Sequence, residues 1–123
     1  MARRSKAERK RAEARGRRAE FVASLLLRAK GYSILASRVR TPLGEVDLIA
    51  KRGRVVAFVE VKQRRNRRTA HQAVSQRNWQ RIAAAAETWI TRRPDLNTCD
   101  WRYDLIAIAP WKFPQHMPDF WRP

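Results

Sequence analysis

The segment from residue 44 to residue 62 most constrains the fold, because it reads as two β-strands joined by a tight turn. Both halves of the segment are rich in Val, Ile, Leu and Phe, and Gly53 lies between them. Glycine accepts the positive φ that short hairpin turns need. The sequence therefore predicts an antiparallel β-hairpin whose second strand contains the apolar run 55–59.

The register of this hairpin places acidic side chains near one another. A turn centred on Arg52 and Gly53 predicts three cross-strand pairs: Ala50 with Val55, Asp47 with Phe58, and Glu45 with Glu60. Since side chains alternate along a strand, Glu60 and Lys62 share one face, and Asp47 lies diagonal to Glu60 on that face. Diagonal neighbours are ~7–8 Å apart. Their carboxylates can therefore converge on one cation at the ~2.0–2.1 Å that Mg²⁺ requires.

A structural interpretation of the same residues stays open. A Glu-x-Lys pair at the end of a strand is common in charged proteins, and carboxylates that face each other repel. Burying them is costly unless a cation or another partner neutralises them. Arg40, Arg64 or Lys62 could fill that role as simple salt-bridge partners.

The composition narrows the class of partner. A chain of 123 residues fits one domain. Its net charge of +17 favours polyanions, so nucleic acid is the expected partner. We find no apolar stretch long enough to span a bilayer and no signal-peptide pattern, and Cys99 is the only cysteine. These features predict a cytoplasmic protein with no membrane partner, no intrachain disulfide and no thiolate metal site.

Two stretches concentrate the positive charge. Residues 1–18 hold nine Lys or Arg against two Glu, a pattern typical of a basic, flexible N-terminal arm that phosphate can make helical. The second cluster directly follows Lys62 and contains Arg64, Arg65, Arg67 and Arg68. Such a cluster can position a nucleic-acid strand through its phosphates, and it is equally consistent with a flexible basic loop.

The rest of the chain predicts an α/β fold with helix, strand, strand, strand, helix and strand in that order. Helical periodicity covers residues 20–30, and a second helix starts after a Ser75 cap and ends before Pro94. Strand patterns cover residues 32–40 and 101–109. We therefore expect three parts: the basic arm (1–18), a folded domain (19–109) and a Pro-rich aromatic tail packed on that domain (110–123).

This order resembles the restriction-endonuclease-like, or PD-(D/E)xK, nuclease fold, an αβββαβ core with a mixed central sheet flanked by helices. Within that superfamily the chain resembles the YraN family of small bacterial proteins and, more distantly, archaeal Holliday-junction resolvases. The similarity covers about residues 16–109 and is carried by residues 16–20, 31–35, 40–50, 58–62 and 102–104.

The resemblance implies a catalytic set of Glu20, Asp47, Glu60 and Lys62. Asp47 and Glu60 would hold Mg²⁺ or Mn²⁺, with the carbonyl of Val61 as a further ligand, and such hard cations prefer oxygen. Lys62 would orient or activate the attacking water and offset charge in the transition state. Glu20 would bind an outer water of the metal or assist as a base.

The nuclease fold also implies a polar residue on the following helix, for which Gln76 is the nearest candidate. Glu45 is either structural or, by the hairpin register, a neighbour of Glu60. The candidate nucleic-acid-binding residues are Arg40, Arg64, Arg65, Arg67, Arg68 and Gln76.

The leading hypothesis is a divalent-metal-dependent endonuclease that hydrolyses phosphodiester bonds in structured or branched DNA. Resolvase relatives cut paired strands symmetrically, which implies a homodimer. The alternative is a catalytically silent protein of nuclease fold that binds DNA or RNA. A third hypothesis is a basic protein associated with RNA or the ribosome.

Overall fold

A computed structural model describes residues 5–65 and 74–123 of the chain. Its elements follow the order α1 (Lys6–Ala29), β1 (Ser33–Thr41), β2 (Gly44–Arg52), β3 (Val55–Gln63), α3 (Gln76–Ile90), a short 3₁₀ turn η1 (Pro94–Leu96), β4 (Asp100–Ile108) and β5 (Gln115–Trp121). The expected α/β class and the order of helix, three strands, helix and strand are confirmed, and β5 is an addition.

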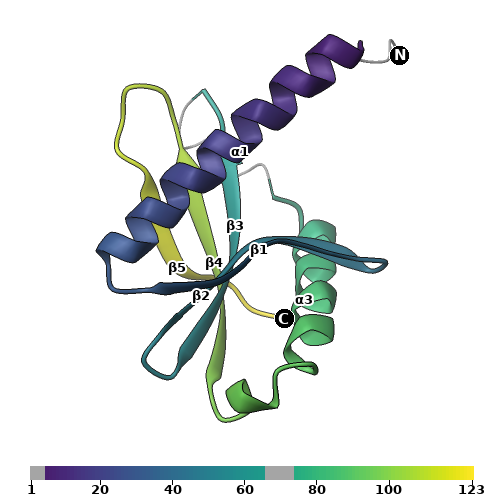
Figure 1. The fold of residues 1–123 in the computed structure, drawn as a ribbon, viewed down its shortest axis with the longest axis vertical. Coiled ribbons are helices and arrows are strands. Elements are labelled where there is room, and N and C mark those ends of the chain that lie inside the picture. The colour runs from purple at the N-terminus through teal and green to yellow at the C-terminus, as the bar shows by residue number, and fades with distance from the viewer. Residues whose placement is uncertain (1–4, 66–73) are drawn as a thin grey trace.

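The strands form one mixed sheet in the order β1-β2-β3-β4-β5. Only β3 and β4 are parallel, because α3 carries the chain from the end of one to the start of the other. The other neighbours are antiparallel. β3 is therefore the central strand, with two strands on each side of it (Figure 1).

The two helices cover opposite faces of the sheet, and alternation along β3 shows why. Val56 and Phe58 belong to the core cluster under α3, whereas Ala57 and Val59 belong to the cluster that holds Ala23 of α1. All four β3 residues are fully buried. Since both faces of the strand pack against helices, its apolar run is continuous rather than alternating.

The predicted hairpin forms, but its predicted register is wrong by two residues. Arg52 pairs with Val55 and Ala50 with Ala57, so the loop contains only Gly53 and Arg54. Gly53 has φ +59°, at the loop position where a type II′ turn requires glycine. A shift by two residues keeps every side chain on its predicted face.

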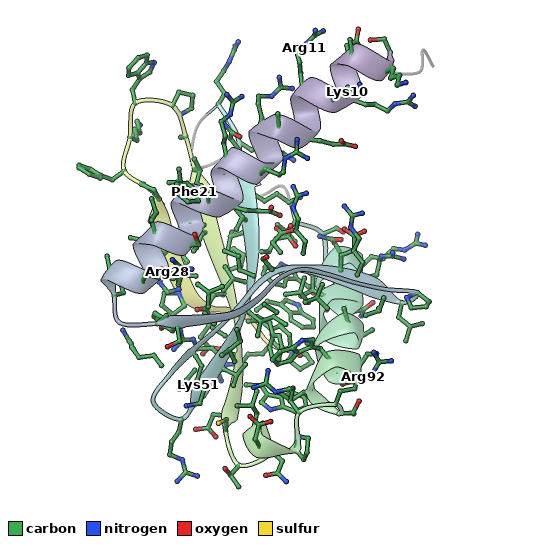
Figure 2. The ribbon with its side chains drawn as sticks, viewed as in Figure 1. Lys10, Arg11, Phe21, Arg28, Lys51 and Arg92 are labelled. Carbon is green, nitrogen blue, oxygen red and sulfur yellow. The ribbon has the colours of Figure 1, made fainter. Side chains whose placement is uncertain are left out.

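Helix α1 begins earlier than predicted. It starts at Lys6 rather than near Glu20, so residues 6–18 of the expected flexible arm are helical. Ser5 and Glu8 form a reciprocal capping box at its start. The first half of α1, which carries Lys10 and Arg11, extends beyond the sheet (Figure 2).

The C-terminal tail is also more regular than predicted, because residues 115–121 form the edge strand β5. Pro118 is tolerated there because an edge strand has one side without a ladder. Trp121 stacks on Trp79 of α3, with ring centroids 5.8 Å apart. The division of the chain into arm, domain and tail stays a prediction.

No helix within residues 5–65 and 74–123 is long and apolar enough to cross a membrane.

Candidate functional site

A cavity of about 780 Å³ opens where β3 ends. It is lined by residues from α1, β2, β3, α3 and the start of the β4–β5 loop. The four predicted catalytic residues all line it: Glu20, Asp47, Glu60 and Lys62. The structure thus brings together side chains from three separate elements that the sequence assigned to one site.

Asp47 and Glu60 face each other at the point where β2 and β3 stop pairing. The ladder between the strands ends with Leu48 opposite Val59, and the two acids occupy the next position. One Asp47 carboxylate oxygen accepts a hydrogen bond from the backbone N–H of Val61 at 2.8 Å. This bond fixes the Asp47 carboxylate against β3, directly beside Glu60.

The two carboxyl groups share a hydrogen bond, and burial governs their protonation. Burial raises the pKa of Glu60 to about 8, with the neighbouring Asp47 charge as the next cause. Burial also raises the pKa of Asp47. The contact between the two carboxyl groups lowers the pKa of Asp47 and raises that of Glu60. Near neutral pH the pair therefore holds a proton that a divalent cation could replace.

Lys62 supplies the nearest positive charge. Its ammonium lies 3.5 Å from Glu60, on the same face of β3 and two residues further along. This charge lowers the pKa of Glu60 but does not outweigh burial. The predicted Glu-x-Lys arrangement is therefore present as a contact.

Glu20 lies in the cavity wall, and its carboxylate forms an ion pair with an arginine that the sequence did not predict as a partner. Arg38 of β1 donates to its carboxylate at 2.6 Å. Arg38 has φ +52°, a conformation that L side chains rarely adopt. Glu20 is thus neutralised from the β1 side.

Glu45 does not lie opposite Glu60 as the predicted register required. It pairs across the first hairpin with Arg40, at an N–O distance of 3.8 Å, and both side chains are exposed. Glu45 still borders the cavity, whereas Arg40 does not. The salt-bridge interpretation therefore describes Glu45 with Arg40, and it stays open for Glu60 with Lys62. Asp47 takes the place beside Glu60.

The donor set can be tested for its fit to a metal ion. In the described ranges no three His, Cys, Asp or Glu gather closely enough to hold a metal by themselves. Mg²⁺ usually takes only one or two carboxylates and completes its shell with water and substrate phosphate oxygens. Two adjacent carboxyl groups, one buried and one half-buried, at the wall of an open cavity fit that requirement.

The predicted nucleic-acid contacts divide into three groups. Arg64 and Arg65 line the cavity. Arg40 and Gln76 do not: Arg40 pairs with Glu45, and Gln76 accepts a hydrogen bond from the indole of Trp121 at 2.8 Å. Arg67 and Arg68 lie outside the described residues.

The cavity lining also contains polar and charged residues that were not predicted as site residues, among them Arg15, Asn78 and Arg81. Asn78 and Arg81 are three residues apart on α3, so they share one face of that helix. Arg15 reaches the cavity because α1 starts at Lys6. The Ser5-x-x-Glu8 capping box was the sequence signal that could have extended the helix.

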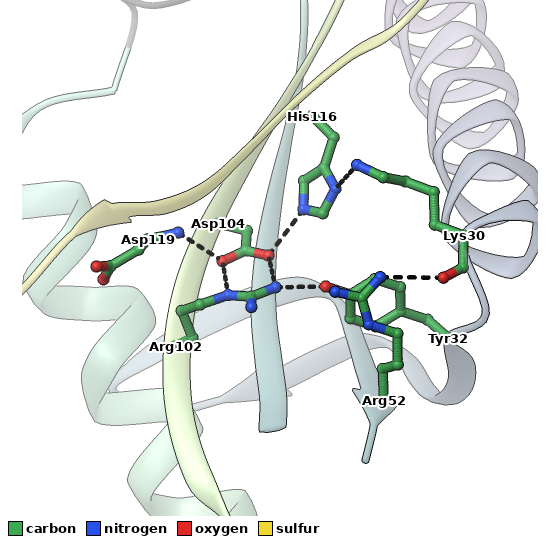
Figure 3. A network of polar contacts seen from close by, with 7 residues as sticks. All are labelled: Lys30, Tyr32, Arg52, Arg102, Asp104, His116 and Asp119. Atoms are coloured by element: carbon green, nitrogen blue, oxygen red, sulfur yellow. Dashed lines mark hydrogen bonds and ion pairs between the residues drawn. The ribbon is translucent and has the colours of Figure 1, made fainter. Parts of the chain in front are cut away.

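A second buried carboxylate, Asp104 of β4, lies apart from the cavity in a closed polar network (Figure 3). Arg102 donates two hydrogen bonds to it, at 2.8 Å each. His116 and the backbone N–H of Asp119 contact it at 2.8 and 3.0 Å. Lys30 has only donors, so at 2.7 Å it donates to Nδ1 of His116, which leaves the His116 proton on Nε2 toward Asp104.

The network also joins elements that are distant in the sequence. Arg102 donates to the Tyr32 hydroxyl at 2.6 Å, and Arg52 donates to the Lys30 carbonyl at 3.1 Å. Asp104 thereby links β4 and β5 to the end of α1. The sequence singled out residues 102–104 without assigning them this role.

Comparison with known proteins places this chain within one family. The sequence profile described as "Uncharacterised protein family UPF0102" matches residues 19–108. UPF0102 proteins of Mesorhizobium japonicum, Chelativorans sp. and Erythrobacter litoralis are 46%, 49% and 50% identical to the chain over 117, 113 and 112 residues. These matches cover 95%, 92% and 91% of the chain, and 94%, 91% and 96% of the relatives. The chain therefore belongs to the UPF0102 family, of which YraN is another name.

Proposed function

We propose that this protein is a divalent-metal-dependent endonuclease of the PD-(D/E)xK superfamily that hydrolyses phosphodiester bonds in structured or branched DNA. One observation carries the proposal: in an open cavity, the half-buried Asp47 lies beside the buried Glu60, whose carboxylate is 3.5 Å from the ammonium of Lys62. Buried like charges are costly unless something neutralises them. Perturbed carboxyl groups in a cavity are therefore candidates for a functional site.

Each residue has a role that its geometry supports. Asp47 and Glu60 would hold Mg²⁺ or Mn²⁺, which supplies Lewis-acid activation of a water and a phosphate oxygen. Lys62 lies beside Glu60, where its ammonium can orient the attacking water and offset charge that develops on the phosphate. Glu20, held by Arg38, offers a carboxylate at the cavity wall that can accept a hydrogen bond from water.

The cavity rim suits a nucleic-acid backbone. Arg15 and Arg81 approach from the two helices, and Arg64 and Arg65 follow the end of β3. Arginine binds phosphate oxygens through a planar fork of donors. Contacts of this kind hold a strand without reading its sequence, which supports DNA structure rather than sequence as the feature recognised. The proposal includes a homodimer, in which each protomer cuts one of two paired strands. Light scattering of the free protein measures its molecular mass and so tests for the dimer.

The second candidate is a nucleic-acid-binding protein without turnover, acting on DNA or RNA. Arg38 neutralises Glu20, and Lys62 partly neutralises Glu60. These internal pairs favour a site that is stable without a metal ion. In this case the basic face of α1 and the arginines of the rim would be the working surface.

The test is cleavage of labelled linear, flapped and four-way-junction DNA with Mg²⁺, Mn²⁺ or EDTA. We expect Asp47→Asn, Glu60→Gln and Lys62→Met each to lower the rate roughly 100-fold or more, since even residues that only orient metal ligands are worth about 10–100-fold. Binding measured in EDTA should stay close to that of the wild type. Asp95→Asn, which alters an exposed ion pair with Arg93, is the matched control.

Two results would contradict the proposal. Tight binding with no cutting in either metal would favour the second candidate. Cutting that survives in Glu60→Gln at the wild-type rate would exclude this carboxyl pair as the catalytic centre.

A further inference from the structure

The loop between β4 and β5 begins at the rim of the cavity. Pro110 lines the cavity together with Glu60 and Lys62. The backbone N–H of Arg64 donates to the carbonyl of Ile108 at 3.0 Å, which ties the exit of β3 to the start of this loop. In Figure 1 the loop projects at the end of the sheet where β3 also ends. Whatever the loop carries is therefore presented beside the carboxyl pair.

The loop carries two aromatic side chains that the fold does not use. Trp111 is fully exposed, and Phe113 is 89% exposed. By contrast, Trp79 is buried and Phe58 contacts three other aromatic rings. Exposed large aromatics gain nothing for the stability of a monomer, so a pair of them on one short loop indicates a binding surface.

The backbone at Trp111 is also unusual. Its φ is +61°, in the left-handed region that favours glycine and disfavours other L residues. Such conformations cluster where function requires a side chain to be held in place. Here the conformation keeps the indole outside the packed sheet.

The chemistry between and around the aromatics is basic. Lys112 separates Trp111 from Phe113 and is exposed, and Arg64 and Arg65 line the adjoining cavity. Aromatic faces next to cations are the elements with which proteins bind single-stranded nucleic acid, because bases stack on the rings while phosphates meet the charges. The cavity beside this loop, lined by Arg64 and Arg65, favours a nucleic-acid strand over a membrane surface as the occupant.

We propose that Trp111, assisted by Phe113, stacks on an unpaired nucleobase of the strand whose phosphodiester lies in the cavity. The inference rests on the proposed function and names the feature of DNA that the site selects: an unstacked base next to the cut. Lys112 contacts the phosphate between successive bases. The preference follows DNA structure rather than sequence, because every base offers a face for stacking.

The proposal is tested by binding in EDTA, so turnover is not needed. A flapped duplex and a fully paired duplex of the same length are compared by fluorescence anisotropy, using wild type, Trp111→Ala and Trp111→Phe. We expect Trp111→Ala to weaken binding of the flapped DNA about 5- to 150-fold, which corresponds to ~1–3 kcal/mol per stacked base. Binding of the paired duplex should change less than about twofold, and Trp111→Phe should keep most of the preference.

Two controls sharpen the result. Phe21→Ala removes another exposed aromatic, which lies on α1 outside the cavity lining, and it should leave both affinities unchanged. A 2-aminopurine base placed in the flap should lose fluorescence on binding wild type and retain it with Trp111→Ala, because stacking quenches it.

Several results would overturn the proposal. The first is equal affinity of Trp111→Ala and wild type for the flapped DNA. The second is that Trp111→Ala weakens binding of flapped and paired DNA equally. The third is that Trp111→Ala loses binding only to anionic phosphatidylserine vesicles. The proposed function fails separately. If wild type never cleaves but Trp111→Ala loses the flap preference, stacking stands and the nuclease falls. If both proteins cleave flapped DNA equally well with Mg²⁺, the nuclease stands and stacking falls.

Discussion

Two buried acidic sites in this protein behave in opposite ways. Asp104 is fully buried, and Glu60 is 8% exposed. Burial alone would raise both pKa values, yet hydrogen bonds from His116, Arg102 and the Asp119 backbone lower the pKa of Asp104. The pKa of Glu60 instead rises to about 8. Burial raises the pKa of both groups, and the donors around Asp104 offset it whereas those around Glu60 do not.

The difference separates a structural acid from a functional candidate. Both oxygens of Asp104 are occupied by donors within the chain, so the network in Figure 3 leaves nothing for a ligand to supply. Asp47 and Glu60 have each other, one backbone N–H and one ammonium at 3.5 Å. The carboxyl pair therefore has few positive partners within the chain, and a bound cation could supply the missing positive charge.

The largest expected effect is on folding stability when the structural acid is neutralised. Asp104→Asn leaves Arg102 without its charged partner in a half-buried position, and breaking such a pair costs ~3–5 kcal/mol. Glu60→Gln replaces a carboxyl group that is already protonated at pH 7, so it should lose little stability there. Urea unfolding of both variants beside wild type measures the contrast. Equal losses would show that the two acids do the same structural work.

A second effect concerns the pH dependence of stability. Between the ordinary carboxyl pKa of 4.5 and about 8, folded Glu60 keeps a proton that the unfolded chain has released. Stability should therefore fall as pH rises through this window, by up to ~1.4 kcal/mol per pH unit.

Glu60→Gln should flatten that slope, and Glu87→Gln, an exposed glutamate on α3, should not. Thermal unfolding from pH 5 to pH 8 measures the slopes. A wild-type slope that persists in Glu60→Gln would assign it to another group.

The smallest expected effect is stabilisation by metal. Mg²⁺ at ten times its dissociation constant should stabilise wild type by about 1.4 kcal/mol, because it binds the folded carboxyl pair only. Glu60→Gln should abolish this gain. Tyr32→Phe, which removes one contact of the Asp104 network, should keep it in full. A melting temperature insensitive to Mg²⁺ at constant ionic strength would argue against a metal site.

The sequence predicted the hairpin faces correctly even though it misplaced the turn. Gly53 was assigned to the second position of the loop and occupies the first, and the resulting error of two residues preserves alternation. The same error hid the direct opposition of Asp47 and Glu60. Turn geometry, rather than the hydrophobic pattern, decided which acids meet.

The remaining differences arise from contacts between distant residues. Arg38 lies 18 residues from Glu20, and no local pattern pairs them. Strand β5 contains Pro118, and local propensity at proline favours irregular structure over a strand. Pairing with β4 overrides that preference. The predicted helix was shorter than α1 because the first half of α1 is polar and lacks an apolar face. The capping box of Ser5 and Glu8 was nevertheless visible in the sequence.

The central place of β3 has a consequence for motion. Residues 55–59 of this strand are paired on both sides and mostly buried, so their amides should be among the slowest to exchange with solvent. A carboxylate on a mobile loop could swing away from a like-charged neighbour. Glu60 directly follows the doubly paired stretch of β3, and Asp47 is bonded to the same strand at Val61, so the two groups have little freedom to separate and relieve their repulsion. Relief must come from a proton or a cation that moves to them.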